Sequence, residues 1–352
     1  MFAEMLGDSI MERLVCCSKR IVLIGAVVLT VCLPLLGQSG PPPLRLVQTI
    51  PLSVDGRMDH LYADVKGMRL FVAALGNNSV EVIDLRAGKV IKSIAGPQKP
   101  QGVWYVASLK KLFVASGNDG MCRVYDGKTL ELIESIKLDL GPDLVGYNPR
   151  TKLVYVGYGG EDAKKDYGNV AIIDARMNKH IGDIQTNAHP GAILVDDSGW
   201  RIYVTIPQNS EVAVIDAKSN KIIKTWRATE AQRTVSLALD VAHGRLFVGA
   251  RNPARVIVYD INSFQRVADF PTVGLMDGMF FDGARKRLYV SGGEGFVDVF
   301  QQQDADHYLP LARIPTRPIA RTSLFVPELN RYYVALPRKD NEPAEIRVYG
   351  PQ

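Results

Sequence analysis

The sequence predicts an all-β protein that folds as a seven-bladed β-propeller, a closed ring of four-stranded sheets. Three observations support this fold class. An aromatic residue followed by valine occurs seven times, at intervals of 42 to 48 residues, which is typical of a propeller blade. A second apolar strand pattern follows each copy. The last copy stops one strand short, and a matching strand pattern precedes the first copy.

The aromatic–valine pair marks the second strand of each predicted blade, because aromatic and β-branched residues favour strands. The seven copies begin at Phe71, Phe113, Tyr155, Tyr203, Phe247, Tyr289 and Tyr333. Five of the third strands that follow end at an aspartate before a turn: Asp84, Asp126, Asp174, Asp216 and Asp260. A carboxylate in that place accepts backbone N–H bonds of the turn. We therefore expect a structural role for this series and no catalytic one.

The stretch from Arg201 to Trp226 shows the blade pattern most clearly. A strand centred on Tyr203 is followed by turn residues from Pro207, and a second strand then ends at Asp216. A turn at Asn220 leads into an outer strand. Three short strands joined by two tight turns are what the repeat predicts for each blade.

The two ends of the chain predict how the ring closes. The seventh copy ends at Tyr349 without a fourth strand, whereas 46–50, before the first copy, resembles the outer strands at 90–94 and 222–226. We expect this N-terminal strand to complete the last blade, because closing the ring removes exposed sheet edges.

On these residues the chain resembles the YVTN-repeat, YncE-like family of seven-bladed propellers. The resemblance is carried by Tyr203-Val204-Thr205 with Asn209 and by the recurrent Val-x-Val-Ile-Asp, and it covers roughly 44–350. The fourth position of the family motif is Ile206 here, in place of asparagine. The resemblance implies the architecture and assigns no activity, since functional sites are grafted onto a fold.

Residues 1–38 are expected to be an export signal or an uncleaved N-terminal membrane anchor. Arg13, Lys19 and Arg20 precede an apolar run at 21–36, and small residues and prolines follow it, which is the pattern of an export signal. Translation could also start at Met11. Residues 39–352 are then a single propeller outside the cytoplasm, in a periplasm or the extracellular space, with the membrane involved only through the N-terminal segment.

Composition excludes several classes of function. The net charge is +5 over 352 residues, and no basic cluster with interleaved aromatic residues occurs, so nucleic-acid binding is not expected. Three of the four cysteines (Cys16, Cys17 and Cys32) precede the predicted domain, which leaves Cys122 without a disulfide partner. No spacing of ligands or attachment motif indicates a metal, a haem or another cofactor. We expect a monomer.

Aligning the blades on the repeated aromatic places the residues before each innermost strand at equivalent positions around the ring. Polar residues there are expected to face the mouth of the central channel, with the long connection 157–168 on its rim. The mixed charges suit a polar or anionic small ligand, or the tip of a partner protein. The expected site consists of Asp59, His60, Gln101, Asp143, His189, Arg233, Asp277 and Arg321.

Several functions are compatible with such a mouth. It could be a ligand site or simply a solvated funnel. We favour a binding or scaffold module, with a lactonase-like hydrolase or lyase as the first alternative and an accessory to a periplasmic redox partner as the second. No catalytic residue is assigned. Asp59 and His60 are consecutive, and strand alternation would place them on opposite faces, so we expect no preorganised pair between His60 and a carboxylate.

Overall fold

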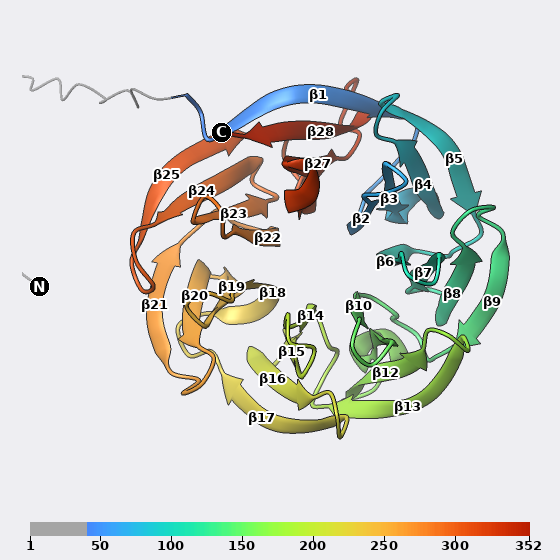
Figure 1. Cartoon of the computed structure of the whole chain (residues 1–352), viewed down its shortest axis with the longest axis horizontal. Helices are drawn as coiled ribbons and strands as arrows, with labels where there is room; N and C mark the ends of the chain where they lie inside the picture. Colours follow the sequence, from blue (N-terminus) through green and yellow to red (C-terminus); the bar gives the residue numbers. More distant parts are fainter. Residues whose placement is uncertain (1–40) are drawn as a thin grey trace, which may run out of the picture. The chain divides into compact units, whose positions relative to one another are not determined.

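A computed structural model describes residues 41–352, which form a ring of seven four-stranded antiparallel sheets (Figure 1). The predicted all-β, seven-bladed propeller is confirmed. The predicted export signal or anchor at 1–38 lies outside the described residues, as do Cys16, Cys17 and Cys32. Within 41–352, no helix is long and apolar enough to span a bilayer.

The strands of each blade are numbered from the channel outward. Blades one to four consist of β2 (Leu61–Asp64), β3 (Arg69–Ala74), β4 (Ser79–Asp84) and β5 (Lys89–Ala95); β6 (Pro100–Val106), β7 (Lys111–Ser116), β8 (Met121–Asp126) and β9 (Leu132–Lys137); β10 (Val145–Asn148), β11 (Leu153–Gly159), β12 (Gly168–Asp174) and β13 (Lys179–Thr186); and β14 (Ile193–Val195), β15 (Arg201–Ile206), β16 (Glu211–Asp216) and β17 (Lys221–Arg227).

Blades five to seven follow in the same order. They consist of β18 (Gln232–Asp240), β19 (Arg245–Asn252), β20 (Ala254–Asp260) and β21 (Arg266–Pro271); β22 (Met276–Asp282), β23 (Arg287–Gly292), β24 (Phe296–Gln302) and β25 (Tyr308–Pro315); and β26 (Ser323–Val326), β27 (Arg331–Leu336), β28 (Ala344–Pro351) and β1 (Leu44–Leu52). Three short 3₁₀ turns lie at Leu75–Asn77, Gly160–Ala163 and Pro327–Leu329.

The seventh sheet joins the two ends of the described chain. Its outermost strand is β1, which pairs antiparallel with β28 from Leu44 opposite Pro351 to Leu52 opposite Ala344. Figure 1 shows β1 and β28 side by side on the rim of the ring. Each pairing satisfies backbone groups that a free sheet edge would leave exposed.

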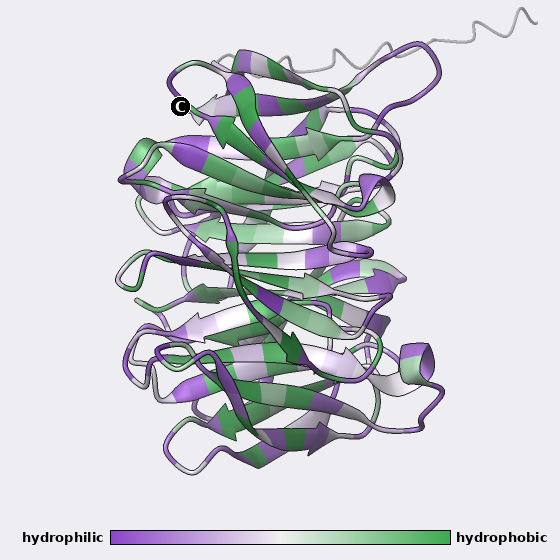
Figure 2. Ribbon diagram, turned by 90° about the vertical axis from the view of Figure 1, so that its right-hand side faces the viewer, coloured by the Kyte–Doolittle hydropathy of each residue, from purple (hydrophilic) through white to green (hydrophobic). Residues whose placement is uncertain are grey.

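The core lies between adjacent blades. Each second strand is buried on both faces, and the repeated aromatic side chains at Phe71, Tyr155 and Tyr203 are fully buried. Phe71 of blade one, for example, packs in one apolar cluster with Val103 and Leu112 of blade two. Burial on both faces explains why these strands read as continuous apolar runs. In Figure 2 hydrophobic residues follow the strands, while hydrophilic residues occupy many connecting loops.

The recurrent aspartates at the ends of the third strands have the structural role predicted for them. Asp84 Oδ1 accepts the backbone N–H groups of Arg86 at 2.7 Å and Ala87 at 2.9 Å. Asp126 does the same for Lys128 and Thr129, at 2.8 Å each. These carboxylates hold turns on the face opposite the predicted mouth.

Candidate functional site at the channel mouth

The residues before the innermost strands are shaped by a recurrent backbone feature. Lys99, Arg233, Leu275 and Ile319 occupy equivalent positions and have φ values of 57°, 61°, 52° and 65°. Side chains rarely adopt this left-handed conformation, and for a β-branched residue such as Ile319 it is a clear outlier. The repeated turn sends the chain into each innermost strand in the same way, and this explains why sequence alignment found the equivalent positions.

All eight predicted mouth residues line one cavity of about 200 Å³, here called the mouth chamber. Each of the seven blades contributes at least one of them. Three further polar residues line the same chamber and were not among the predicted ones: Arg57, Gln208 and Arg251. The structure therefore brings the predicted set together.

Arg251 was missed because it lies at the end of a second strand, β19, rather than before an innermost one. A signal for it exists in the repeat. The fourth residue after each repeated aromatic is Leu75, Gly117, Gly159, Pro207, Arg251, Gly293 and Pro337. Arg251 is the only charged residue in this series.

Two arginines share one carboxylate in the mouth chamber. Arg251 Nη2 lies 3.1 Å from Asp277 Oδ1, and Arg321 Nε lies 2.8 Å from Asp277 Oδ2. Arg251 Nε also donates a hydrogen bond to the Met276 carbonyl oxygen at 2.8 Å. These contacts fix both guanidinium groups on one side of the chamber.

The electrostatics around Arg251 show how densely cations are placed here. Burial lowers the pKa of the Arg251 guanidinium, and Asp277 opposes this effect. The positive charges of Arg321, Arg233 and Arg57 lower the pKa further. Four guanidinium groups thus lie within electrostatic reach of one another, an arrangement that an anion between them would stabilise.

Asp59 is the most perturbed carboxyl group of the chamber. It is 5% exposed, and burial raises its pKa to about 7 although His60 opposes this effect. Asp277 and Asp143 raise the pKa further, and Arg57 opposes them. A buried carboxyl group near other carboxylates resists ionisation, so Asp59 titrates close to neutral pH.

The expectation that alternation would separate Asp59 from His60 is wrong. His60 Nε2 lies 3.4 Å from Asp59 Oδ1, within ion-pair distance. Both residues precede β2, which begins at Leu61, so the alternation of a strand does not apply to them. His60 thus does have a neighbouring carboxylate.

His189 and Asp143 form a second acid–base contact on the opposite side of blade one. His189 Nδ1 donates a hydrogen bond to the Gly159 carbonyl oxygen at 2.9 Å, and Nε2 lies 3.6 Å from Asp143 Oδ2. Burial would lower the pKa of His189, but the contact with Asp143 raises it overall. Burial would likewise raise the pKa of Asp143, but His189 lowers it. Because Gly159 begins the connection to β12, this loop borders the mouth.

Gln101 carries an unexplained polar atom. Its side chain is buried, and within residues 41–352 its Oε1 has no hydrogen-bond partner. An unpaired buried acceptor is costly and calls for an explanation. A ligand with a hydrogen-bond donor beside its charged group would supply the missing partner.

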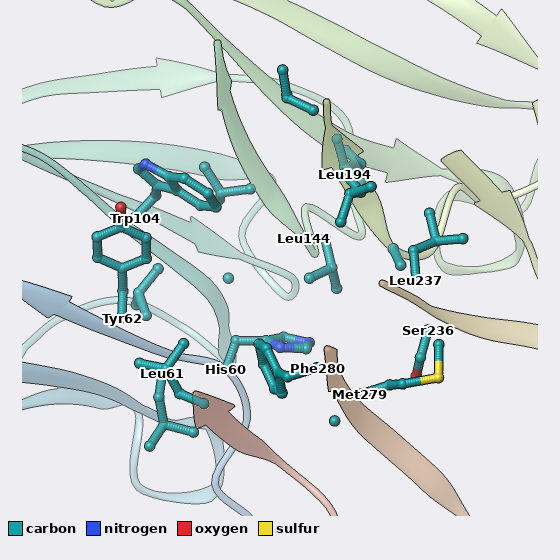
Figure 3. A pocket seen from close by; sticks show the side chains of 18 of the residues that line it. His60, Leu61, Tyr62, Trp104, Leu144, Leu194, Ser236, Leu237, Met279 and Phe280 are labelled. Carbon is teal, nitrogen blue, oxygen red and sulfur yellow. The ribbon is translucent and has the colours of Figure 1, made fainter. Parts of the chain in front are cut away.

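A second cavity, of about 400 Å³, continues the channel beyond the mouth chamber and is here called the lower chamber. The two cavities share five lining residues: His60, Leu144, Ala192, Val235 and Asp277. The lower chamber is lined mainly by apolar side chains of the innermost strands (Figure 3). Tyr62 and Trp104 lie side by side there, with ring centroids 4.5 Å apart.

A metal site does not emerge from this geometry. Within residues 41–352, no group of three or more histidine, cysteine, aspartate and glutamate side chains is placed to hold a metal ion.

Comparison with solved structures supports the fold. The chain is similar to hydrazine synthase of Kuenenia stuttgartiensis, with a TM-score of 0.72 and 18% identity, over 84% of this chain and 97% of that one. It is also similar to a chain of the mitotic checkpoint complex, with a TM-score of 0.73 and 12% identity, over 98% and 99% of the two chains. These likenesses show the fold alone.

Comparison of the sequence with protein-family models and with curated proteins gave no match. The resemblance to the YVTN-repeat, YncE-like proteins therefore stays a prediction.

Proposed function

We propose that this protein is an exported binding module that takes a small anionic ligand at the mouth chamber. One observation carries the proposal: the chamber gathers four arginines and two histidines against three aspartates. One of these aspartates, Asp59, is only partly ionised at neutral pH because its pKa is raised to about 7. The chamber thus has an excess of positive charge in a partly enclosed space, where charge interactions are strong.

Arg233 is the residue most open to a ligand. Within the described part of the chain its guanidinium group has no ion pair or hydrogen bond, and the residue is exposed. Arg321 and Arg251 are already oriented by Asp277. A planar guanidinium group binds carboxylate, sulfate or phosphate through paired hydrogen bonds, so an anion held between Arg233 and Arg321 would complete the chamber.

Export is part of the proposal and rests on the pattern of residues 1–38. The family resemblance supports the same architecture for the binding module. A protein partner that inserts an acidic tip into the mouth would use the same cations, and a redox partner would be one such protein.

Titration calorimetry with acetate, succinate and sulfate at low ionic strength tests the proposal. We expect binding that Arg233→Gln weakens about tenfold, the lower end of what a charge-assisted hydrogen bond contributes, about 1.5 kcal/mol. Arg176→Gln is the matched control, because Arg176 is an exposed arginine in the turn after β12 and pairs only with Asp174 across that turn. No binding by any of these anions, or equal losses in the two variants, would contradict the proposal.

The hydrolase alternative has one observation in its favour, the contact between Asp59 and His60. A carboxyl group with a pKa of about 7 is suited to proton transfer at neutral pH. Lactone hydrolysis that is lost in both Asp59→Asn and His60→Ala, with the melting temperature retained, would favour an enzyme over a binding module.

A further inference from the structure

We propose that the ligand is a single-chain amphiphilic anion, with its acidic head in the mouth chamber and its apolar chain in the lower chamber. This inference rests on the proposed function, because it extends the same site along the channel. A straight-chain alkyl carboxylate is the simplest member of this class.

The first argument is that the two chambers are continuous and opposite in character. His60 and Asp277 form part of the junction together with three apolar residues, Leu144, Ala192 and Val235. Above the junction the lining is dominated by charged groups, and below it by hydrocarbon and aromatic rings. A molecule that occupies both must have a polar end and an apolar end.

The second argument comes from the repeat itself. Two positions beyond the junction layer, the innermost strands place large apolar side chains: Tyr62, Trp104, Leu194, Phe280 and Leu324. All five are only half-buried, although they lie inside the ring (Figure 3). Apolar surface left facing a cavity gains free energy when an apolar group covers it.

The third argument is that the lower chamber offers little to a second polar group. Ser236 Oγ donates to the Asp277 carbonyl oxygen, and Ser323 Oγ accepts a hydrogen bond from Tyr332 Oη at 2.9 Å. At the far end the lining includes Asp196 and Asp197, whose negative charges oppose a second acid group. The chamber therefore favours a chain with an uncharged end.

The volume sets the length of the chain. A cavity of about 150 Å³ holds benzene, so the 400 Å³ of the lower chamber holds on the order of ten carbons by the same measure. A single medium-length chain fits this space, whereas two long lipid chains do not.

The test is titration calorimetry of the protein with straight-chain carboxylates from butanoate to decanoate, each below the concentration at which it forms micelles. We expect each added CH₂ to tighten the Kd about fourfold, which corresponds to about 0.8 kcal/mol. Octanol, octylammonium and octanedioate should each bind at least tenfold more weakly than octanoate. The first two lack the anionic head, and the third places a second carboxylate near Asp196 and Asp197.

Variants separate the head from the chain. Leu194→Asn puts an amide into the lower chamber and should weaken octanoate binding at least fivefold, the equivalent of about 1 kcal/mol for an unpaired buried amide, without changing acetate binding. Leu324→Asn makes the same test from blade seven if Leu194→Asn lowers the melting temperature. Leu309→Asn is the matched control, because Leu309 is 55% exposed on the outer strand β25.

The outcomes distinguish this inference from the proposed function. If carboxylates of all lengths bind equally and Arg233→Gln weakens them, the inference is wrong and the anion site stands. If octanol binds as tightly as octanoate, the head is not recognised and the inference is wrong. If no carboxylate, sulfate or longer chain binds, both are wrong.

Discussion

Replacing Asp59 by asparagine should stabilise the protein increasingly as the pH rises from about 4 to 7. The carboxyl group is 5% exposed and its pKa is raised from 3.8 to about 7. Between these values the unfolded chain carries an ionised Asp59 while the folded chain keeps it protonated, so folding of the wild type loses stability with rising pH. Asparagine has no proton to lose and is free of this penalty.

The magnitude follows from the size of the shift. About three pKa units at about 1.36 kcal/mol each correspond to about 4 kcal/mol. The free energy of unfolding of Asp59→Asn minus that of the wild type should therefore rise by about 1.4 kcal/mol per pH unit between pH 4 and 7. Above pH 7 the difference should stay constant, since both the folded and the unfolded wild type are then ionised.

The assay is urea unfolding followed by tryptophan fluorescence at five pH values from 4.5 to 8.5. Asp143→Asn is the control with the opposite sign: His189 lowers the pKa of Asp143 although burial would raise it. That variant should lose stability relative to the wild type as the pH rises through the acid range. A difference between Asp59→Asn and the wild type that is independent of pH, or that shrinks as pH rises, would refute the reasoning.

Three other predictions follow from the same structure. Sulfate binding should tighten several-fold from pH 8 to pH 6, because Asp59 loses its negative charge below a pKa of about 7 and His189, with its pKa raised, gains a positive one; calorimetry showing no change, or the opposite trend, would count against it. Cys122 should not react with a thiol reagent until the protein unfolds, since burial raises its pKa to about 12; rapid labelling of the folded protein would disprove this. Deleting residues 44–50 should lower the melting temperature substantially, because it removes the pairing of β1 with β28; an unchanged melting temperature would show that this strand does not stabilise the ring.

The repeat made the architecture predictable, because the aromatic–valine pair marks a strand that is buried on both faces in every blade. The same register brought eight polar residues to one chamber from seven separate parts of the chain. Register arguments succeed here because the innermost strands of a propeller are equivalent around one axis.

The details of the site were harder to predict, for two physical reasons. The contact of Asp59 with His60 depends on where β2 begins, and strand ends are poorly marked in a sequence. Arg251 reaches the chamber from a second strand, outside the aligned positions. The lower chamber was not predicted at all, because apolar residues of an innermost strand read as core whether they pack against a neighbouring blade or face the channel.

The most direct test of an anion held at the mouth of an apolar channel is a crystal structure of the protein with 8-bromooctanoate. The carboxylate and the bromine atom are located independently, the second by its anomalous scattering. The account predicts the carboxylate within about 2.7–2.9 Å of guanidinium nitrogens of Arg233 or Arg321 and the bromine in the lower chamber near Trp104. Bromine on the outer surface of the ring, or a carboxylate away from these arginines, would contradict it.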